Sequence, residues 1–317
     1  MSTTPSVQLG KGNLRSSRLA YGCWRIAGTW DPTLVTPEKE AEGRGGVLAA
    51  YEAGYTLFDL ADIYCDGVCE RIFGQVLKSH PSLRQSILVA TKCGIRKKGD
   101  PKPDSPYRYD FSAGHIVQSC EASLKRMNLE RIDLYLLHRP DFLCAPDEVA
   151  GAFSELKRAG KVCEFGVSNF QPSRVAALQQ ACPMPLLVNQ LEISLSRLDC
   201  FRDGTLDQCL AERITPQAWS PLGGGRLVDA GPVDLQSPDH AHRLRVRGVL
   251  DQVARERGVS RQVIALAWLL KHPAGIVPIV GSTKPDRIRD AMKAVEVDLT
   301  REEWYRLLEA AQDQRLP

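Results

Sequence analysis

The 317-residue sequence is 43% hydrophobic and 25% charged, and its 41 basic residues nearly balance 38 acidic ones. Such a chain can bury a large core, and a scattered net charge of +3 argues against a nucleic-acid-binding surface. The longest nearly unbroken apolar run, residues 263–270, is far shorter than the roughly 20 residues of a membrane span.

Short apolar strands alternate with helical patterns along the chain. The strands are predicted at 17–26 with a break at Gly22, from 56 to Asp59, and at 87–92, 132–138, 163–169, 186–193, 216–222 and 275–281. The helices are predicted at about 43–54, 69–79 and 113–127, from Pro146 onward, at about 172–181, 203–213, 243–257, 260–272 and 285–295, and at the carboxyl end. The last helix begins with a capping box, Thr300 with Glu303.

This alternation predicts one (β/α)8 TIM barrel, an α/β fold, spanning residues 1–317 as a single domain. Strands that are apolar on both faces imply a parallel sheet, and eight strand–helix units fit a closed barrel better than an open sheet. The first strand is not followed by the glycine-rich fingerprint of the open dinucleotide-binding fold. Residues 96–111 are expected to form a loop over the barrel mouth, because regular units resume on both sides.

The amino terminus and the cysteines indicate the compartment. Residues 1–10 are polar and lack the features of a secretory signal, so we expect no export. Ten cysteines at irregular spacing are typical of reduced thiols in the cytoplasm. Cys65 and Cys69 are the closest pair, but no second pair completes a metal site, so we expect no metal.

Four side chains with usable chemistry lie at or just after predicted strand ends: Asp59, Tyr64, Lys92 and His138. In an α/β barrel the carboxyl ends of the strands meet at one face, where active sites are built. A lysine beside a tyrosine stabilises the phenolate and lowers its pKa from about 10. An aspartate keeps that lysine charged, and a histidine can position a carbonyl oxygen. The set suits protonation of an oxygen while another group delivers hydride to carbon.

Several motifs follow one another in a fixed order: Phe-Asp-Leu-Ala-Asp-Ile-Tyr at 58–64, Thr-Lys-Cys-Gly at 91–94, Leu-His-Arg-Pro-Asp at 137–141, Gly-Val-Ser-Asn-Phe at 166–170 and Ala-Trp-Ser-Pro-Leu-Gly-Gly-Gly-Arg-Leu at 218–227. Shorter matches lie at 22–24, 189–190 and 278–282. With these motifs the sequence resembles the aldo-keto reductases, and in particular the YdhF-like oxidoreductases of bacteria. The resemblance implies a barrel that binds NADPH across its carboxyl-end face and reversibly reduces an aldehyde or ketone to an alcohol.

The resemblance also implies a role for each matching residue. Tyr64 would be the general acid, Lys92 the group that tunes it, Asp59 the partner of Lys92, and His138 the residue that orients the substrate carbonyl. The implied nicotinamide site comprises Ser168, Asn169, Gln190 and, stacked on the ring, Trp219. The implied pyrophosphate site comprises Ser220, Leu222 and the glycine backbone at 223–225, where a close approach is possible.

For the 2′-phosphate of NADPH, the candidates that follow the last strand are Ser282, Thr283, Lys284 and Arg287. The Arg287 guanidinium can make a forked contact with phosphate. Gly22 and Gly281 are further positions of the implied cofactor site. Gly281 departs from the lysine that many family members have, so the preference for NADPH would depend on Lys284 and Arg287. Trp24 and Arg25 are expected to line the substrate pocket.

Each candidate also has a purely structural interpretation. Asp59 could cap a turn, Lys92 could be a solvated strand end, and His138 could be a satisfied core histidine. Ser168 and Asn169 are common helix caps, Trp219 could be core, and Arg287 could be a surface charge. Asp62 is expected to cap a turn and Cys93 to be a packing residue.

Two other functions stay open from the sequence. One is an NADPH-binding regulatory subunit with little turnover, since the barrel also resembles the β subunits of potassium channels. The other is a barrel enzyme of phosphorylated sugars, with the helix after the last strand holding the substrate phosphate. A monomer or a small homo-oligomer is expected in each case.

Overall fold

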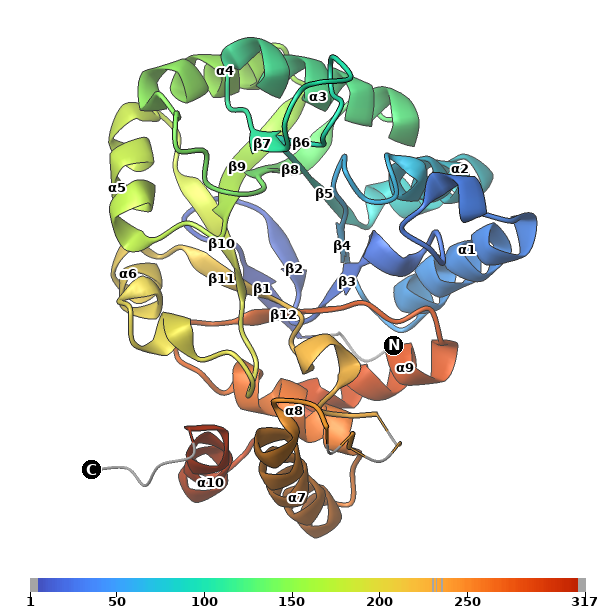
Figure 1. The fold of residues 1–317 in the computed structure, drawn as a ribbon, viewed down its shortest axis with the longest axis vertical. Coiled ribbons are helices and arrows are strands. Elements are labelled where there is room, and N and C mark those ends of the chain that lie inside the picture. The colour runs from blue at the N-terminus through green and yellow to red at the C-terminus, as the bar shows by residue number, and fades with distance from the viewer. Residues whose placement is uncertain (1–4, 230, 232, 235, 313–317) are drawn as a thin grey trace.

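The computed structural model describes residues 5–229, 231, 233–234 and 236–312, and its centre is a closed barrel of eight parallel strands (Figure 1). The barrel strands are β3 (Ala20–Gly22), β4 (Leu57–Asp59), β5 (Leu88–Cys93), β8 (Ile132–Leu137), β9 (Val162–Ser168), β10 (Leu186–Glu192), β11 (Thr215–Trp219) and β12 (Val277–Val280). They pair in this order, and β12 pairs with β3 to close the ring. The predicted (β/α)8 barrel is therefore confirmed.

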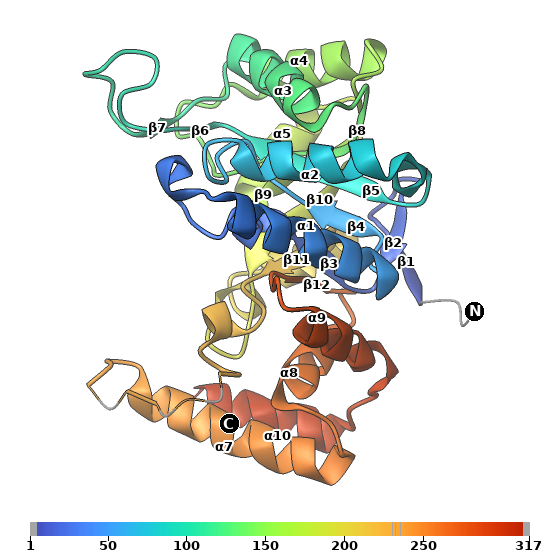
Figure 2. The same cartoon turned by 90° about the vertical axis from the view of Figure 1, so that its right-hand side faces the viewer.

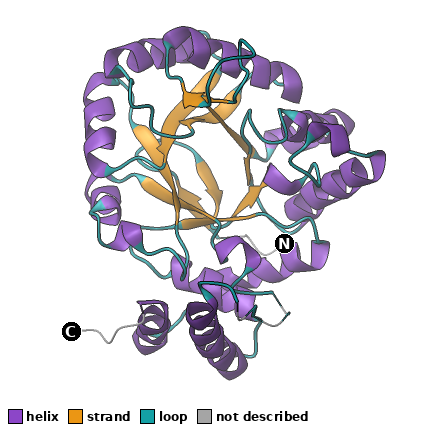
Figure 3. Ribbon diagram, in the orientation of Figure 1, coloured by secondary structure: helices purple, strands orange, loops and turns teal. Residues whose placement is uncertain are grey.

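Helices surround the strands on the outside of the barrel (Figure 3). They are α1 (Pro37–Glu52), α2 (Val68–Ser79), α3 (Ala113–Met127), α4 (Pro146–Arg158), α5 (Pro172–Ala181), α6 (Thr205–Glu212), α7 (His240–Arg257), α8 (Arg261–Leu270), α9 (Pro285–Met292) and α10 (Arg301–Gln312). Every residue of β3, β4, β8 and β12 is buried, as expected for strands between a filled barrel interior and a helical layer.

A hairpin that the sequence did not predict lies at the amino ends of the strands. It pairs β1 (Ser6–Gln8) with β2 (Arg15–Ser17), and it lies on the side of the barrel away from the β6–β7 loop (Figure 2). Leu9 is fully buried among strand residues of the barrel interior, and the Gly10 N–H donates to Thr215 Oγ1 at 2.8 Å. The hairpin therefore covers the floor of the barrel and leaves the opposite end for function.

Helix α1 begins at Pro37, six residues before the predicted start at about 43. Thr36 caps it, because the Thr36 side chain accepts a hydrogen bond from the Lys39 N–H, and Pro37 occupies a first-turn position where a missing N–H costs nothing. The predicted end is correct, since Gly54 adopts a left-handed φ of 95° just after the helix.

The segment 96–111 forms a protruding loop whose base is a two-stranded ladder, β6 (Ile95–Arg96) with β7 (Arg108–Tyr109) (Figure 2). Arg96 lies 2.9 Å from Asp100 and 3.0 Å from Asp110, so charge pairs hold the loop together. This loop lies at the carboxyl ends of the strands, over the barrel mouth as predicted.

Helix α10 is fixed to α8 by a reciprocal tryptophan contact. The Trp268 and Trp304 rings stack with centroids 5.2 Å apart, and each indole N–H donates to the other residue's backbone carbonyl, at 3.1 and 3.0 Å. The predicted capping box is present: the Thr300 N–H donates to Glu303, and the Glu303 N–H donates to Thr300 Oγ1.

Within the described ranges, no helix is long and apolar enough to cross a membrane, and no group of His, Cys, Asp and Glu side chains could hold a metal ion. All ten cysteines are free thiols. Residues 1–4 of the polar amino terminus, and positions 230, 232 and 235 of the polar segment 223–242, lie outside the described residues.

Candidate active site

Lys92 is at the centre of a buried polar group at the barrel mouth. Its ammonium donates to Asp59 Oδ2 at 2.8 Å, to the Leu60 carbonyl at 2.7 Å and to Tyr64 Oη at 3.0 Å. An ammonium has three N–H donors, so all three are used. Because the Tyr64 oxygen accepts from Lys92, the phenolic proton stays available for another acceptor.

Asp59 balances this buried charge. Its second oxygen, Oδ1, accepts from Gln190 Nε2 at 2.8 Å, so both carboxylate oxygens are engaged. Lys92 is 0% exposed and Asp59 is 3% exposed. A charge pair this deep in the protein needs such complete hydrogen bonding to be tolerated.

Burial and neighbouring charges have opposite effects on the pKa of Lys92 and on the pKa of Tyr64. Burial acts to lower the pKa of Lys92, but Asp59 and Tyr64 together raise it above its ordinary value, which keeps the ammonium charged. Burial raises the pKa of Tyr64 and Lys92 lowers it, with a net increase. Lys92 therefore lowers the pKa of Tyr64 as expected, but desolvation of the phenolate is the larger effect, so the net shift is upward.

His138 lies beside Tyr64, with ring centroids 5.9 Å apart. Burial, and then the charges of Lys92 and Arg139, hold the pKa of His138 well below its ordinary value. The imidazole is therefore neutral near pH 7. Its buried Nδ1 has no hydrogen-bond partner among the described residues.

A second set of hydrogen bonds joins the ends of β9, β10 and β11. The Trp219 Nε1–H donates to Asn169 Oδ1 at 3.0 Å, and Asn169 Nδ2 donates to Ser168 Oγ at 2.8 Å. Ser168 Oγ in turn donates to the Gln190 carbonyl at 2.9 Å. Asn169 has a left-handed φ of 63°, which asparagine tolerates better than most residues. These links fix the orientation of the Trp219 indole and of the amide groups.

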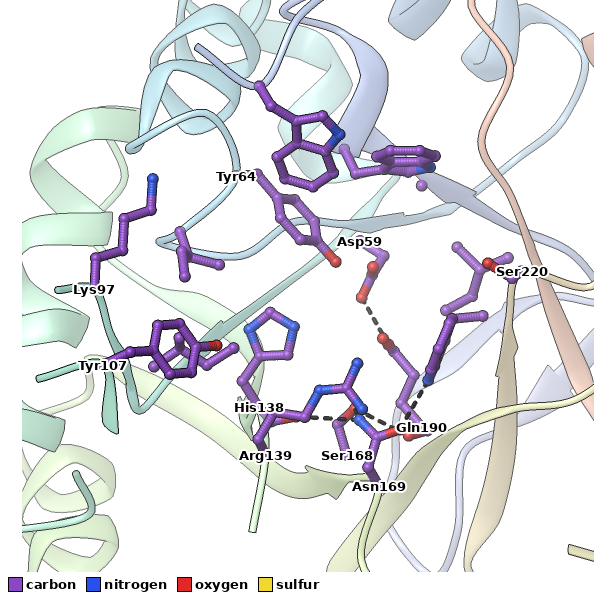
Figure 4. A pocket seen from close by; sticks show the side chains of 17 residues that line it. Asp59, Tyr64, Lys97, Tyr107, His138, Arg139, Ser168, Asn169, Gln190 and Ser220 are labelled. Carbon is purple, nitrogen blue, oxygen red and sulfur yellow. Dashed lines mark hydrogen bonds between the residues drawn. The ribbon is translucent and has the colours of Figure 1, made fainter. Parts of the chain in front are cut away.

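The residues around Lys92 and the hydrogen-bonded set that includes Asn169 and Trp219 border one cavity of about 460 Å³ at the barrel mouth (Figure 4). Ten of the predicted residues border it: Gly22, Trp24, Asp59, Tyr64, His138, Ser168, Asn169, Gln190, Trp219 and Ser220. Lys92 lies beneath it, in contact with Asp59 and Tyr64. The cavity is large enough for a small organic molecule.

A second cavity, of about 250 Å³, adjoins the first, because Trp24, Ser220 and Ile279 border both. The remaining predicted residues line it, namely Leu222, Gly281, Ser282, Thr283, Lys284 and Arg287, together with Arg25. At Gly224 an added Cβ would meet nothing within 4 Å, so the backbone there is open to a close approach. Three cationic residues, Arg25, Lys284 and Arg287, and exposed backbone suit a phosphate-bearing group, so the residues present fit a phosphorylated dinucleotide.

Gly281 is explained by its neighbour. A Cβ at position 281 would lie 2.6 Å from Trp24 Nε1, closer than side chains pack. The Trp24 ring also makes a cation–π contact, with the Arg25 guanidinium 4.4 Å from its centroid. The Trp24 indole thus takes the space that a longer side chain at 281 would need.

Comparison with known proteins identifies the family. The model of the aldo/keto reductase family matches residues 18–312. The chain belongs to this family of oxidoreductases. It is 42% identical over 316 residues to 6-dehydroglucose reductase from Novosphingobium aromaticivorans, covering 98% of this chain and 96% of that protein. It is 40% identical over 296 residues to the oxidoreductase YdhF from Escherichia coli, covering 93% of each.

Solved structures of the family share the fold. A thermostable aldo-keto reductase superposes with a TM-score of 0.81 at 25% identity, covering 96% of this chain and 99% of that one. A glycerol dehydrogenase from Gluconobacter oxydans gives a TM-score of 0.84 at 25% identity, covering 100% and 98%. The predicted resemblance to aldo-keto reductases, and to YdhF in particular, is confirmed.

Seven residues that line the main cavity of this aldo-keto reductase were given no role from the sequence. Three are isoleucines, Ile63, Ile95 and Ile279, and the other four are Trp30, Lys97, Tyr107 and Arg139. Trp30, and Lys97 and Tyr107 of the 96–111 loop, lie in segments that do not directly follow a predicted strand, so the sequence did not single them out. Arg139 had a signal, since it directly follows His138 at a strand exit.

Asp62 lies behind the cavity, close to the buried Glu70. Glu70 accepts from Thr91 Oγ1 and from Arg126 Nε, each at 2.6 Å, but the buried Oδ1 of Asp62 has no partner among the described residues. Burial, and then the charge of Glu70, raise the pKa of Asp62 to about 8. The carboxyl of Asp62 also interacts with the backbone N–H of Ile63, which is compatible with the expected turn cap, while its Oδ1 is left without a partner.

Proposed function

We propose that this aldo-keto reductase reversibly reduces an aldehyde or ketone to an alcohol with NADPH, in the cytoplasm. The observation that carries the proposal is the arrangement around Lys92, whose ammonium holds Asp59 and Tyr64 Oη together at the cavity wall. The family match and the name of the 42% identical relative, a 6-dehydroglucose reductase, support carbonyl reduction.

Tyr64 would donate the proton. Its hydroxyl oxygen accepts from Lys92, so its hydrogen can turn toward a substrate oxygen in the cavity. When the proton leaves, the nearby ammonium stabilises the phenolate. His138, neutral at pH 7, can donate a ring N–H to the same oxygen and so orient the carbonyl. NADPH, when bound, supplies the hydride that adds to the carbonyl carbon.

The cofactor site proposed here spans both cavities. Ser168, Asn169 and Gln190 are available for an amide, and Trp219 offers a flat face next to them. Ser282, Thr283, Lys284 and Arg287 are proposed to bind the 2′-phosphate, since these residues line the second cavity and two of them are cations.

The regulatory-subunit alternative receives no specific support. Such a protein would bind NADPH without needing an acid held ready for proton transfer, whereas the Tyr64 hydroxyl is directed by a fully hydrogen-bonded pair. An enzyme of phosphorylated sugars could use Lys284 and Arg287 for its substrate, but would not need the aromatic face of Trp219.

The test is a binding and turnover experiment on the intact protein. Titration with NADPH and with NADH, followed by quenching of tryptophan fluorescence, is expected to give saturable binding that favours NADPH. Oxidation of NADPH is then followed with a panel of aldehydes that includes a hexose carrying an aldehyde at C6. Binding of NADPH without multiple turnovers on any carbonyl compound would favour the regulatory-subunit hypothesis. Absence of binding of either nucleotide would contradict the proposal.

A further inference from the structure

Arg139, the residue after His138, projects its side chain into the main cavity. In Figure 4 its side chain extends between His138 and Asn169 toward the middle of the cavity. The guanidinium carbon lies 5.2 Å from the centroid of the Trp219 ring. This is a cation–π contact, which holds the planar group in place while its N–H edges stay free to donate.

The loop that carries Arg139 is firmly held. His138 is 8% exposed, and the Asp141 carboxylate, also 8% exposed, accepts from the Phe111 N–H at 3.0 Å and the Leu143 N–H at 2.9 Å. The position of Arg139 relative to His138 is therefore set by the fold.

No carboxylate pairs with Arg139 in the part of the chain that the structure describes. Two other partly buried arginines are paired with carboxylates. Arg84 lies 2.9 Å from Asp133, and its side chain is 24% exposed. Arg126 lies 2.6 Å from Glu70, and its side chain is 31% exposed. Arg139 is also only partly exposed. The buried Arg247 lacks a carboxylate partner too, but its guanidinium donates to the backbone carbonyls of Arg226 and Gly231, whereas Arg139 makes no hydrogen bond to another described residue.

The cavity itself cannot neutralise this charge. Among the described residues that line it, Asp59 is the only carboxylate, and both its oxygens are engaged by Lys92 and Gln190. Lys97, the other cation of the lining, forms an ion pair with Asp66. The charge of Arg139 is felt by the cavity groups around it, since it lowers the pKa of His138 and opposes the burial that raises the pKa of Tyr107.

We propose that Arg139 binds an anionic group, a carboxylate or a phosphate, of the carbonyl substrate. The proposal rests on the proposed carbonyl reduction and adds to it a substrate class: an aldehyde or ketone that also carries a negative charge. A guanidinium binds both anions through parallel N–H donors. Since His138 and Arg139 are adjacent, one substrate can present its carbonyl to His138 and its anion to Arg139.

The test compares charged and uncharged aldehydes of similar shape. With NADPH, kcat and KM are measured for 4-carboxybenzaldehyde and 4-nitrobenzaldehyde, with glyoxylate, succinic semialdehyde and glyceraldehyde 3-phosphate covering other spacings and the phosphate. Wild type should favour the anionic member through KM, and added salt should weaken that preference. Arg139→Gln should reduce the kcat/KM ratio of the pair about tenfold or more, chiefly through KM for the anion. Arg139→Lys, which keeps the charge and loses the fork, should be intermediate.

A matched control uses another arginine that stacks on an aromatic ring. The Arg301 guanidinium lies 5.6 Å from the Tyr305 ring centroid on α10, remote from the mouth, and Arg301→Gln should leave the ratio as in wild type. An equal loss on 4-carboxybenzaldehyde and on a neutral C6-aldehyde hexose in Arg139→Gln would overturn the proposal. A weaker affinity for NADPH with an unaltered ratio would overturn it as well, since Arg139 would then serve the cofactor.

The same question can be asked without turnover. Calorimetric titration with benzoate and with benzamide should show binding of the anion that Arg139→Gln loses. If wild type reduces no carbonyl compound but still binds benzoate through Arg139, the proposed reaction fails and the anion site stands. If neutral aldehydes are reduced and no anion preference exists, the reaction stands and the anion site fails.

Discussion

Trp24 lies against Gly281 so closely that a Cβ at position 281 would come within 2.6 Å of the indole nitrogen. The two residues lie at the exits of β3 and β12, which pair in the barrel. The glycine therefore allows the tryptophan to border both cavities at once.

Gly281→Ala should displace Trp24 or strain the contact, and so lower the free energy of unfolding by about 1 kcal/mol. Urea denaturation followed by tryptophan fluorescence measures this. Gly151→Ala is the control, because a Cβ there would meet nothing within 4 Å in helix α4, where alanine should stabilise by about 0.5 to 1 kcal/mol. Similar stability for the two variants would contradict the packing argument.

Asp59→Asn should lower the free energy of unfolding more than a double substitution that removes both charges of the Asp59–Lys92 pair. It leaves the fully buried Lys92 ammonium without its counter-ion, so we expect the free energy of unfolding to fall by about 3 kcal/mol. In the double variant Asp59→Asn/Lys92→Met the stranded charge is gone, and part of the stability should return. Urea unfolding of the two single variants and the double variant tests this, and losses that simply add would refute the coupling.

Asp62→Asn should stabilise the protein in a pH-dependent way. The folded pKa of about 8 lies above the ordinary value of about 4, so the native state keeps a proton that the unfolded chain releases between these pH values. Stability from this group is complete below about pH 4 and is lost as the pH rises toward 8. The asparagine variant should gain about 1 to 2 kcal/mol over wild type at pH 8 and less at pH 5.

Urea unfolding at pH 5 and pH 8 measures the gain from Asp62→Asn. The same substitution at the exposed Asp104 controls for the loss of one negative charge. A gain that is equal at both pH values would show that the carboxyl of Asp62 is not the cause.

Arg287→Gln should raise the dissociation constant of NADPH about tenfold, with a smaller effect on NADH, because the guanidinium would contact the 2′-phosphate. Fluorescence titration with both nucleotides measures this. Arg289→Gln is the matched control, since Arg289 lies on the same helix, is exposed, and pairs with Asp286 at 2.7 Å. Equal losses for NADPH and NADH would remove Arg287 from the phosphate site.

The barrel could be predicted because its signals are local. Most strands are short apolar runs, and the last helix carries its own capping box, Thr300 with Glu303. The amino-terminal hairpin was missed because β1 and β2 are three residues each and gain stability only by covering the barrel floor. The early start of α1 was readable, since Thr36 and Pro37 form a helix-start signal.

The candidate site was predictable where residues follow strands and unpredictable where loops fold over the mouth. Asp59, Lys92 and His138 are placed by strand geometry alone. Tyr107 depends on the path of a loop, and the sign of the Tyr64 pKa shift depends on how deeply the phenol is buried. The unpaired state of Arg139 could not be read from the sequence, because it depends on which carboxylates lie nearby in space.

The most direct test of the account is the turnover of Tyr64→Phe. The change removes only the proton donor and leaves Lys92 paired with Asp59, so kcat for NADPH-dependent reduction should fall about a thousandfold. The dissociation constant of NADPH, from fluorescence titration of the same sample, should stay close to the wild-type value. Near-complete turnover in this variant would contradict the central claim that Tyr64 is the acid.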